Sequence, residues 1–366
     1  MTTNSAINRS HLAASADPGA RLSALLGPAF AAYREAWAWA ESGLRPNHPL
    51  HLDVDVTTAC NFHCPMCPAG TTGHFFPGFK KGLFLDRNLY RKALAEGSAW
   101  GLPSIRLGMT GEPLLVADID EWVSEARQAG VLDISLITNG RLLTAAVSKR
   151  LLKAGLTRLM ISVDAASPEI YSEVRPGGHW PTLLNNINEF LRIRREANSI
   201  TPLLRVSFVE MSVNQTDREA FKTLFEPLAD YLSFQRYLNI LGETDTEFSP
   251  APFAGGEGYC SEPFTRMALH ADGGLFPCCA DFGRQRPLGN LADGSLLATW
   301  QSEAALSLTA KDAAGREPCR RCLAASISSE KNHWPPKVEN TPGDPQIQVL
   351  SNNSYLAGDE GQGTER

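Results

Sequence analysis

The sequence predicts an α/β fold, in which a partial barrel of six strand and helix units precedes a small cysteine-rich domain with a β-hairpin and a helix. Short apolar runs with many β-branched residues alternate with amphipathic stretches, an order typical of parallel strands joined by crossover helices. Six such units are fewer than the eight of a closed barrel. Five of the eight cysteines follow the last unit, which indicates a second, chemically distinct part of the chain.

The six expected strands are separated by stretches that favour helix. In the stretch 142–153, for example, Leu143, Val147 and Leu151 recur every four residues and line one helix face. In parallel arrangements of this kind, catalytic groups gather at the carboxyl ends of the strands, so the residues after each strand are the first candidates for a site. The expected strands span residues 51–57, 104–109, 132–138, 158–164, 203–211 and 231–237.

Changes in composition divide the chain into four expected parts. An amphipathic stretch over 22–39 predicts one helix near the N-terminus. A linker rich in Gly, Pro and Thr over 242–258 follows the last strand, and the final residues are rich in Pro, Gly, Asn and Asp, which favours disorder. The expected parts are an N-terminal extension, 1–48, the barrel, 49–241, the cysteine-rich domain, 242–333, and a disordered tail, 334–366.

Composition and charge limit the classes of function. The 366 residues are 43% hydrophobic and 20% charged, as in a soluble globular protein. The formal net charge of -6 argues against nucleic acid as a main partner. No apolar run of about 18 residues could span a membrane, and the N-terminus lacks the apolar core of a secretory signal, so we expect a cytoplasmic protein. Because thiols stay reduced in that compartment, the cysteines are expected to be ligands or catalysts and not disulfides.

A first group of cysteines directly follows the first expected strand. Cys60, Cys64 and Cys67 lie within eight residues, so their thiolates can face one metal centre. One interpretation is a closed structural zinc site with His63 or His74 as the fourth ligand. The other is an iron-sulfur cluster that is held by three cysteines and leaves one iron open for another molecule.

Further motifs decide between these interpretations by resemblance. The Cys-x3-Cys-x2-Cys spacing after the first strand of a six-unit β/α chain resembles the radical S-adenosylmethionine (radical SAM) superfamily, over about residues 50–240. The segment Thr110-Gly111-Glu112-Pro113 after the second strand is similar to that family's Gly-Gly-Glu-Pro segment, with Thr110 in place of the first glycine. The resemblance implies a partial (β/α)6 TIM-like barrel and a [4Fe-4S] cluster on Cys60, Cys64 and Cys67. It also implies that Thr110, Gly111 and Glu112 hold the methionine amino group of S-adenosylmethionine.

Three later segments are also similar to family segments near the cofactor. They are Thr138-Asn139-Gly140, Ser162-Val163-Asp164 and Ser212-Val213-Asn214, at the ends of the third, fourth and fifth strands. By the resemblance, Ser162 and Asp164 contact the ribose or carboxylate of S-adenosylmethionine, Asn139 lies near the cofactor, and Asn214 lies beside the adenine. Taken alone, Ser162 and Asp164 are better explained as turn residues or helix caps than as cofactor contacts.

The second group of cysteines lies in the smaller domain. There, 267–278 predicts a hairpin with Asp272-Gly273-Gly274 at its turn, and 302–314 predicts a short helix. The pattern alone fits zinc and iron-sulfur equally well. The order Cys-x12-Gly-x4-Cys followed by Cys-x2-Cys resembles the SPASM and shorter "twitch" extensions of radical SAM enzymes, which implies an auxiliary [4Fe-4S] cluster with an electron-transfer role. The implied ligands are Cys260, Cys278, Cys319 and Cys322.

Cys279 is left over by these assignments. It is either a small buried apolar residue beside a cluster ligand or a hydrogen-atom donor to a substrate radical. Charged and polar residues near strand ends could orient a substrate or could be ordinary surface residues; they are Arg175, Glu210, Gln235 and Arg236.

The leading functional hypothesis is a radical SAM oxidoreductase, a dehydrogenase or an epimerase. It would cleave S-adenosylmethionine reductively to a 5′-deoxyadenosyl radical and take hydrogen from a small polar metabolite such as an amino sugar, cyclitol or nucleotide sugar. Flavodoxin or ferredoxin is the implied electron donor. No domain of about 80 residues precedes the barrel, which disfavours the alternative of a peptide or protein side-chain maturase. A zinc-binding protein, or an iron-sulfur electron-transfer protein without S-adenosylmethionine chemistry, is the alternative from another class.

Overall fold

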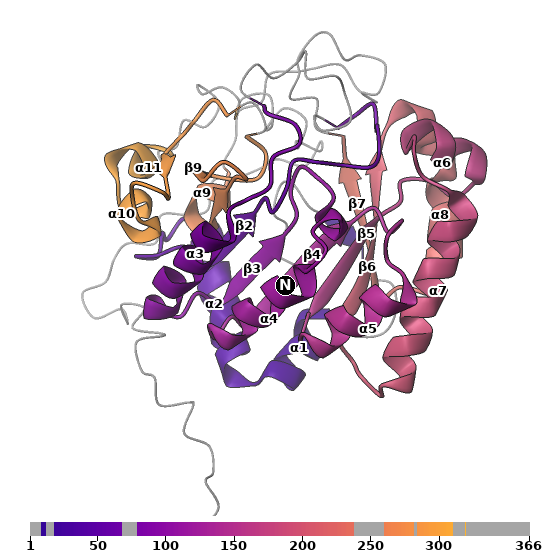
Figure 1. The fold of residues 1–366 in the computed structure, drawn as a ribbon, viewed down its shortest axis with the longest axis horizontal. Helices are drawn as coiled ribbons and strands as arrows, with labels where there is room; N and C mark the ends of the chain where they lie inside the picture. Colours follow the sequence, from indigo (N-terminus) through magenta and orange to yellow (C-terminus); the bar gives the residue numbers. More distant parts are fainter. Residues whose placement is uncertain are drawn as a thin grey trace, which may run out of the picture.

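One continuous sheet organises the described part of the chain (Figure 1). The structure is a computed structural model that describes residues 9–11, 18–67, 79–237, 260–281, 284–309 and 319. The order of the strands in the sheet is β1-β7-β6-β5-β4-β3-β2-β8-β9-β10. The strands are β1 Arg9–His11, β2 His51–Val54, β3 Ser104–Leu107, β4 Asp133–Thr138, β5 Arg158–Ser162, β6 Leu203–Glu210, β7 Tyr231–Arg236, β8 Arg266–Leu269, β9 Gly274–Phe276 and β10 Gly289–Asn290.

The six predicted strands are confirmed as β2 to β7. They lie side by side in sequence order and all pair in parallel, as expected for a partial (β/α)6 TIM-like barrel. The first of them is shorter than predicted, because Thr57 leaves the sheet and pairs with Phe84 in an isolated bridge. Figure 1 shows the crossover helices α3, α4, α5, α7 and α8 on the outer side of the strands.

The helices follow the predicted alternation with the strands. The predicted helix in 142–153 begins at Ala145, where the Thr144 side chain accepts a hydrogen bond from the Val147 amide. The helices are α1 Pro18–Leu26, α2 Pro28–Glu41, α3 Arg87–Trp100, α4 Ile119–Gln128, α5 Ala145–Lys153, α6 Pro168–Val174, α7 Trp180–Glu196, α8 Arg218–Phe225, α9 Glu262–Thr265, α10 Leu296–Trp300 and α11 Glu303–Ser307, with 3-10 turns η1 Pro113–Leu115 and η2 Ser212–Asp217.

The N-terminal extension contains two helices in place of the single one predicted over 22–39. Gly27 separates α1 from α2 with a φ of 75°, which glycine adopts readily, and Pro28 has no amide hydrogen with which to continue α1. Phe30 and Tyr33 of α2 pack in a cluster with Leu203 and Tyr231, the first residues of β6 and β7. The two helices therefore cover the amino ends of the strands and close that end of the barrel.

The cysteine-rich part continues the sheet of the barrel. Strand β8 pairs in parallel with β2, and β8 and β9 form the predicted antiparallel hairpin, with Gly273 at its turn at a φ of 83°. The predicted helix in 302–314 is present as α11, and its residues from 310 lie outside the described residues. The predicted linker, 242–258, and tail, 334–366, also lie outside them. The shared sheet brings the β8-β9 hairpin, which Cys260 and Cys278 flank, to the edge of the first strand of the barrel.

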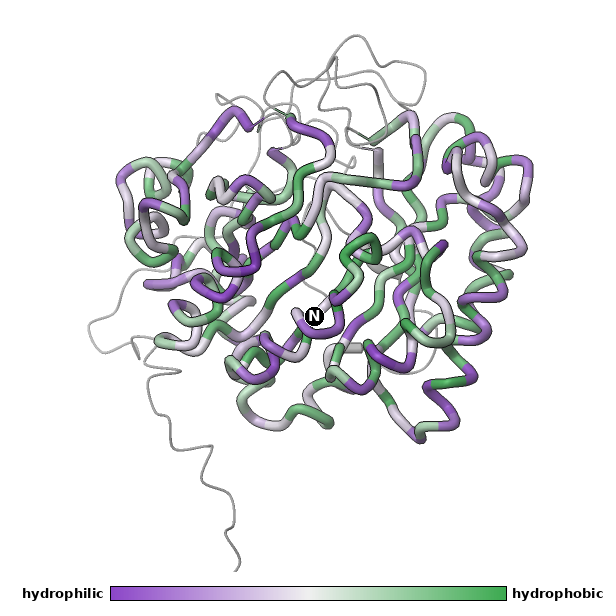
Figure 2. The backbone as a smooth tube through the Cα atoms, in the orientation of Figure 1, coloured by the Kyte–Doolittle hydropathy of each residue, from purple (hydrophilic) through white to green (hydrophobic). Residues whose placement is uncertain are grey.

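Alternation along the strands gives the sheet an apolar outer face and a polar inner face. Leu52 and Val54 of β2 belong to the main hydrophobic core beneath the helices, so His51 and Asp53 point to the inner side. The same parity applies to β3, where Ile105 and Leu107 join the core and Arg106 points inward. Figure 2 shows apolar colour concentrated along the central strands and mixed colour along the helices. The interior of the barrel is therefore unusually rich in polar side chains.

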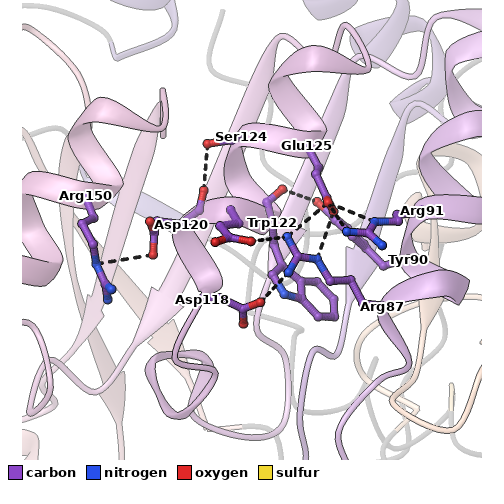
Figure 3. Close-up of polar contacts among 10 residues, drawn as sticks. Arg87, Tyr90, Arg91, Asp118, Asp120, Trp122, Ser124, Glu125 and Arg150 are labelled. Atoms are coloured by element: carbon purple, nitrogen blue, oxygen red, sulfur yellow. Dashed lines mark hydrogen bonds and ion pairs between the residues drawn. The ribbon is translucent and has the colours of Figure 1, made fainter.

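Ion pairs hold the outer helices α3, α4 and α5 together (Figure 3). Arg87 of α3 contacts Asp118, Glu121 and Glu125 at 2.5, 2.8 and 3.1 Å. Arg150 of α5 contacts Asp120 of α4 at 3.4 Å. Each such partly exposed pair contributes about 0 to 1 kcal/mol, so this network aligns the helices more than it stabilises the fold.

Candidate active site at the carboxyl ends of the strands

The loop that carries the first three cysteines is anchored just beyond β2. Phe62 is fully buried, and the His63 amide donates to the Pro176 carbonyl at 2.9 Å. Cys64 is buried, Cys60 and Cys67 are partly buried, and the His63 side chain is exposed. His63 therefore points away from the buried Cys64, which disfavours it as a zinc ligand, and His74 lies outside the described residues.

Burial raises the pKa of the Cys60 and Cys64 thiols, although the Phe62 amide opposes the shift at Cys60 and Arg175 opposes it at Cys64. Because burial disfavours the charged thiolate, these cysteines need a positive partner to ionise. Thiolates are soft ligands, which suits the iron of an iron-sulfur cluster. Within the described ranges, no three metal-ligating side chains surround a common point. The Arg175 guanidinium, 3.7 Å from Cys64 Sγ, already supplies one donor to a ligand sulfur.

Glu112 connects the ends of β3 and β4. Its buried carboxylate accepts hydrogen bonds from the Leu114 amide at 2.9 Å, the Thr138 hydroxyl at 2.7 Å and the Asn139 amide at 2.7 Å. Burial raises the pKa of Glu112, and these three donors oppose the shift. A carboxylate has about four acceptor positions, so one position is left to receive the amino group that the resemblance assigns to it.

Asp55 positions the neighbouring Thr110. The Thr110 amide and hydroxyl donate to the two Asp55 carboxylate oxygens at 3.1 and 2.6 Å, which leaves the Thr110 carbonyl available to a ligand. Burial raises the pKa of Asp55 to about 6. Sequence reasoning missed this residue; the available signal was an acidic side chain between two valines, Val54 and Val56, at a strand end.

Gly111 lies against the start of the cysteine loop. A Cβ at this position would lie 2.2 Å from the Thr57 carbonyl oxygen and 2.5 Å from that of Ala59, so a larger residue does not fit. The following amide, of Glu112, donates to the Ala59 carbonyl at 2.8 Å. The Thr110 to Glu112 segment is thus packed directly onto the loop that carries the first cysteines.

The remaining predicted cofactor residues surround the same loop. The side-chain nitrogen of Asn139 donates a hydrogen bond to the side-chain oxygen of Asn61 at 2.8 Å. Asp164 has a φ of 62°, accepts from the Val209 amide at 2.8 Å and forms an ion pair with Arg175, the residue that also contacts Cys64. These contacts connect the ends of β4, β5 and β6 to the cysteine loop.

Asn214 and Ser162 differ in how much of their side chain remains available. The buried Asn214 amide donates to the Asp164 carbonyl at 2.8 Å and the Val209 carbonyl at 2.9 Å, and its oxygen accepts from the Met211 amide at 2.8 Å. Its side-chain donors are therefore occupied in holding the turn after β6. Ser162 lies at the carboxyl end of β5 and is partly exposed.

The structure also shows the contacts of the other polar candidates near the strand ends. Glu210 pairs with Arg218 at 2.6 Å near the surface, and Gln235 lies 3.4 Å from the Ser233 hydroxyl. The Arg236 side chain lies outside the described residues. Glu210 is thus a surface ion-pair residue, whereas Arg175 belongs to the cysteine loop.

Cys279 faces the inside of the barrel. The thiol is partly buried, and the positive charge of Arg106, which points inward from β3, acts on it. Burial raises the pKa of Cys279, and Arg106 opposes the shift. The neighbouring Cys278 and the preceding Cys260 flank the β8-β9 hairpin. Cys319 belongs to the described residues, but the residues on either side of it do not. Cys322 lies outside the described residues, so the ligand set of the auxiliary cluster stays a prediction.

A buried charge network lies below Cys279. Asp53 accepts from Arg106 at 2.6 Å and from His51 at 3.0 Å, and Arg266 lies 3.5 Å away. Burial alone would raise the pKa of Asp53, but Arg106, His51 and Arg266 together hold it well below its usual range. Since Asp53 and Arg106 join β2 to β3 and Arg266 comes from β8, the network ties the cysteine-rich part to the barrel.

Comparison with known families agrees with this geometry. The sequence model of the radical SAM superfamily matches residues 54–211, and the model of the SPASM iron-sulfur cluster-binding domain matches residues 260–323. The chain thus combines a radical SAM domain with a C-terminal SPASM domain. The two domains imply a [4Fe-4S] cluster that binds S-adenosylmethionine and an auxiliary iron-sulfur cluster.

Curated relatives share the barrel part. A probable GTP 3′,8-cyclase of Methanocaldococcus jannaschii is 30% identical over 174 residues, 45% of this chain and 51% of the relative. A GTP 3′,8-cyclase of Limosilactobacillus fermentum is 32% identical over 138 residues, 37% of this chain and 40% of the relative. The chain thus spans about half the length of the curated relatives it matches, or less.

Solved structures show the same fold at low sequence identity. Native anSMEcpe with bound AdoMet is 15% identical, with a TM-score of 0.56 over 78% of this chain and 94% of that one. Streptococcus suis SuiB bound to the precursor peptide SuiA is 16% identical, with a TM-score of 0.56 over 75% of this chain and 69% of that one. Separately, none of the helices in the described ranges is both long and apolar enough to cross a membrane.

Proposed function

We propose that this radical SAM enzyme abstracts hydrogen from a small polar metabolite held inside the partial barrel, and that it oxidises or epimerises this substrate. When bound, the first cluster and S-adenosylmethionine supply the 5′-deoxyadenosyl radical that takes the hydrogen. The proposed ligands of that cluster are Cys60, Cys64 and Cys67. The proposed S-adenosylmethionine contacts are Thr110, Gly111, Glu112, Asn139, Ser162, Asp164 and Asn214.

The position of Cys279 is the observation that carries the proposal. Its thiol feels the charge of Arg106, whose side chain points inward from β3. A thiol there can give a hydrogen atom to a substrate carbon radical from the side opposite the cofactor, which inverts that carbon. The apolar-residue interpretation does not account for a guanidinium charge that acts on the thiol.

The two outcomes differ in their electron balance. In epimerisation, Cys279 donates a hydrogen atom, and its thiyl radical then takes up one proton and one electron that comes from the external donor. In oxidation, the substrate radical loses one proton and passes one electron to the auxiliary cluster. We propose Cys260, Cys278, Cys319 and Cys322 as the ligands of that cluster, and a flavodoxin or ferredoxin as the external donor.

The names of the relatives bear on the class of substrate. The curated relatives are named for GTP, a nucleotide, which supports a small-molecule substrate for this chain too. SuiB, which was solved with a bound precursor peptide, is only 16% identical, and a likeness at that level shows the fold alone. A small metabolite is therefore favoured over a peptide or protein side chain.

Turnover in D2O with candidate sugars and cyclitols tests the role of Cys279. Because a thiol exchanges its hydrogen with solvent, an epimerised product should carry one deuterium at the inverted carbon. Cys279→Ser should still form 5′-deoxyadenosine but should give no epimer. A Cys279→Ser enzyme that matches the parent rate, together with a parent product free of deuterium, would retire the donor role and leave oxidation.

A further inference from the structure

Several arginines have buried nitrogen atoms without a hydrogen-bond partner. They include Nε of Arg106, Nε of Arg205, and both Nε and Nη2 of Arg284. Native proteins leave few buried polar atoms unpaired, and those that remain call for an explanation such as an absent ligand. These unpaired atoms are all donors on cationic groups, so the missing partner is an acceptor.

Strand parity places Arg205 inside the barrel. Leu204, Val206 and Phe208 of β6 belong to the main core on the outer face, so Arg205 and Ser207 face inward. Strand β6 is separated from β3 by β4 and β5 in the curved sheet. Arg106 of β3 also faces inward by strand parity, so both guanidinium groups point into the interior of the barrel.

Arg205 differs from the other interior arginines in having no carboxylate partner. Arg106 pairs with Asp53 at 2.6 Å, and Arg158 pairs with Asp133 at 3.0 Å. No carboxylate among the described residues lies within ion-pair distance of Arg205. Burial lowers the pKa of Arg205 to about 10; Tyr231 opposes the shift, and repulsion from Arg106 and Arg158 adds to it, so Arg205 stays charged at neutral pH. A partly buried guanidinium whose Nε lacks a hydrogen-bond partner and that has no carboxylate beside it favours an acceptor from a ligand.

A hydroxyl lies beside this guanidinium. Ser207 is two residues further along β6 on the same face, and its buried Oγ has no hydrogen-bond partner either. A guanidinium and a hydroxyl side by side can donate together to the oxygens of one anionic group, and arginine binds such groups through parallel N–H bonds.

We propose that Arg205 and Ser207, assisted by Arg106, bind an oxyanion group of the substrate inside the barrel. The shared chemistry is that of a phosphate ester or a carboxylate. This inference rests on the proposed function, because it assigns an anionic group to the small metabolite on which the enzyme would act. The anionic group would hold the substrate between the S-adenosylmethionine site and Cys279.

Calorimetric titration of the anaerobically reconstituted full-length enzyme tests the site. The probes are inorganic phosphate, pyrophosphate and acetate at constant ionic strength. We expect Arg205→Gln to weaken binding of the preferred anion at least tenfold, and Ser207→Ala to weaken it about threefold. Arg91→Gln is the matched control, since it removes one positive charge from the exposed face of α3 and should leave the Kd unchanged.

The outcomes separate this site from the proposed function. Preference for phosphate or pyrophosphate would assign a phosphorylated substrate, and preference for acetate a carboxylate. Equal affinity in the parent and Arg205→Gln, or no binding by the parent at millimolar anion, overturns the inference even where 5′-deoxyadenosine still forms. Loss of 5′-deoxyadenosine in the parent would instead refute the proposed function. If Arg205→Gln keeps anion binding but changes the EPR spectrum of the auxiliary cluster, the arginine compensates the negative charge of that cluster. This result would also overturn the inference.

Discussion

Gly111→Ala should displace the Thr110 to Glu112 segment from the cysteine loop and so weaken the binding of S-adenosylmethionine. The added methyl would lie 2.2 and 2.5 Å from the carbonyl oxygens of Thr57 and Ala59, and these backbone atoms cannot rotate away as a side chain would. The segment must therefore move, and the hydrogen bond of 2.8 Å from the Glu112 amide to Ala59 is lost. Overpacking of this kind costs roughly 1–3 kcal/mol and the hydrogen bond about 1 kcal/mol, so we expect a loss of about 2 to 4 kcal/mol.

The assay is urea unfolding of the reconstituted enzyme, together with equilibrium binding of S-adenosylmethionine. Gly130→Ala is the control, because Gly130 has a φ of 90° and nothing within 4 Å of an added Cβ. That variant should lose roughly 1–2 kcal/mol of stability from backbone strain and bind S-adenosylmethionine normally. Gly111→Ala should bind it at least tenfold more weakly. The reasoning is refuted if Gly111→Ala keeps the parent affinity and is no less stable than Gly130→Ala.

The remaining predictions concern the clusters and the buried acid. Changing Cys60, Cys64 and Cys67 together to Ala should lower the iron content from about eight to about four per chain, and an unchanged content would contradict the first cluster site. Arg175→Met should lower the reduction potential of the first cluster in an EPR titration, because a positive donor beside Cys64 is lost; an equal potential would exclude that contact. The pKa of Asp55 is raised by burial from 3.8 to about 6, so its ionisation should cost about 3 kcal/mol as pH rises from 4 to above 6. Asp55→Asn should flatten that part of the stability profile, and parallel profiles would argue against the raised pKa.

Much of the fold was predictable because its signals are local. The positions of β2 to β7 follow from the alternation of apolar and polar residues, and the cysteine spacings lie within short segments. The prediction of one helix over 22–39 was wrong, although its cause, Gly27 followed by Pro28, was visible in the sequence. The residues of the first cysteine loop and of the Thr110 to Glu112 turn were predictable for the same reason, since each follows directly from a strand end.

The sequence by itself therefore determined the order of β2 to β7 and, through its resemblance to a known family, the chemistry expected of the cysteines and the class of enzyme. Tertiary structure decided which distant side chains meet. The pairing of β8 with β2, the ion pair of Arg106 with Asp53 and the absence of a carboxylate beside Arg205 among the described residues all depend on strand neighbours and register. Local periodicity gives the face on which a residue lies, but charge compensation depends on atoms a few ångströms away that belong to other parts of the chain.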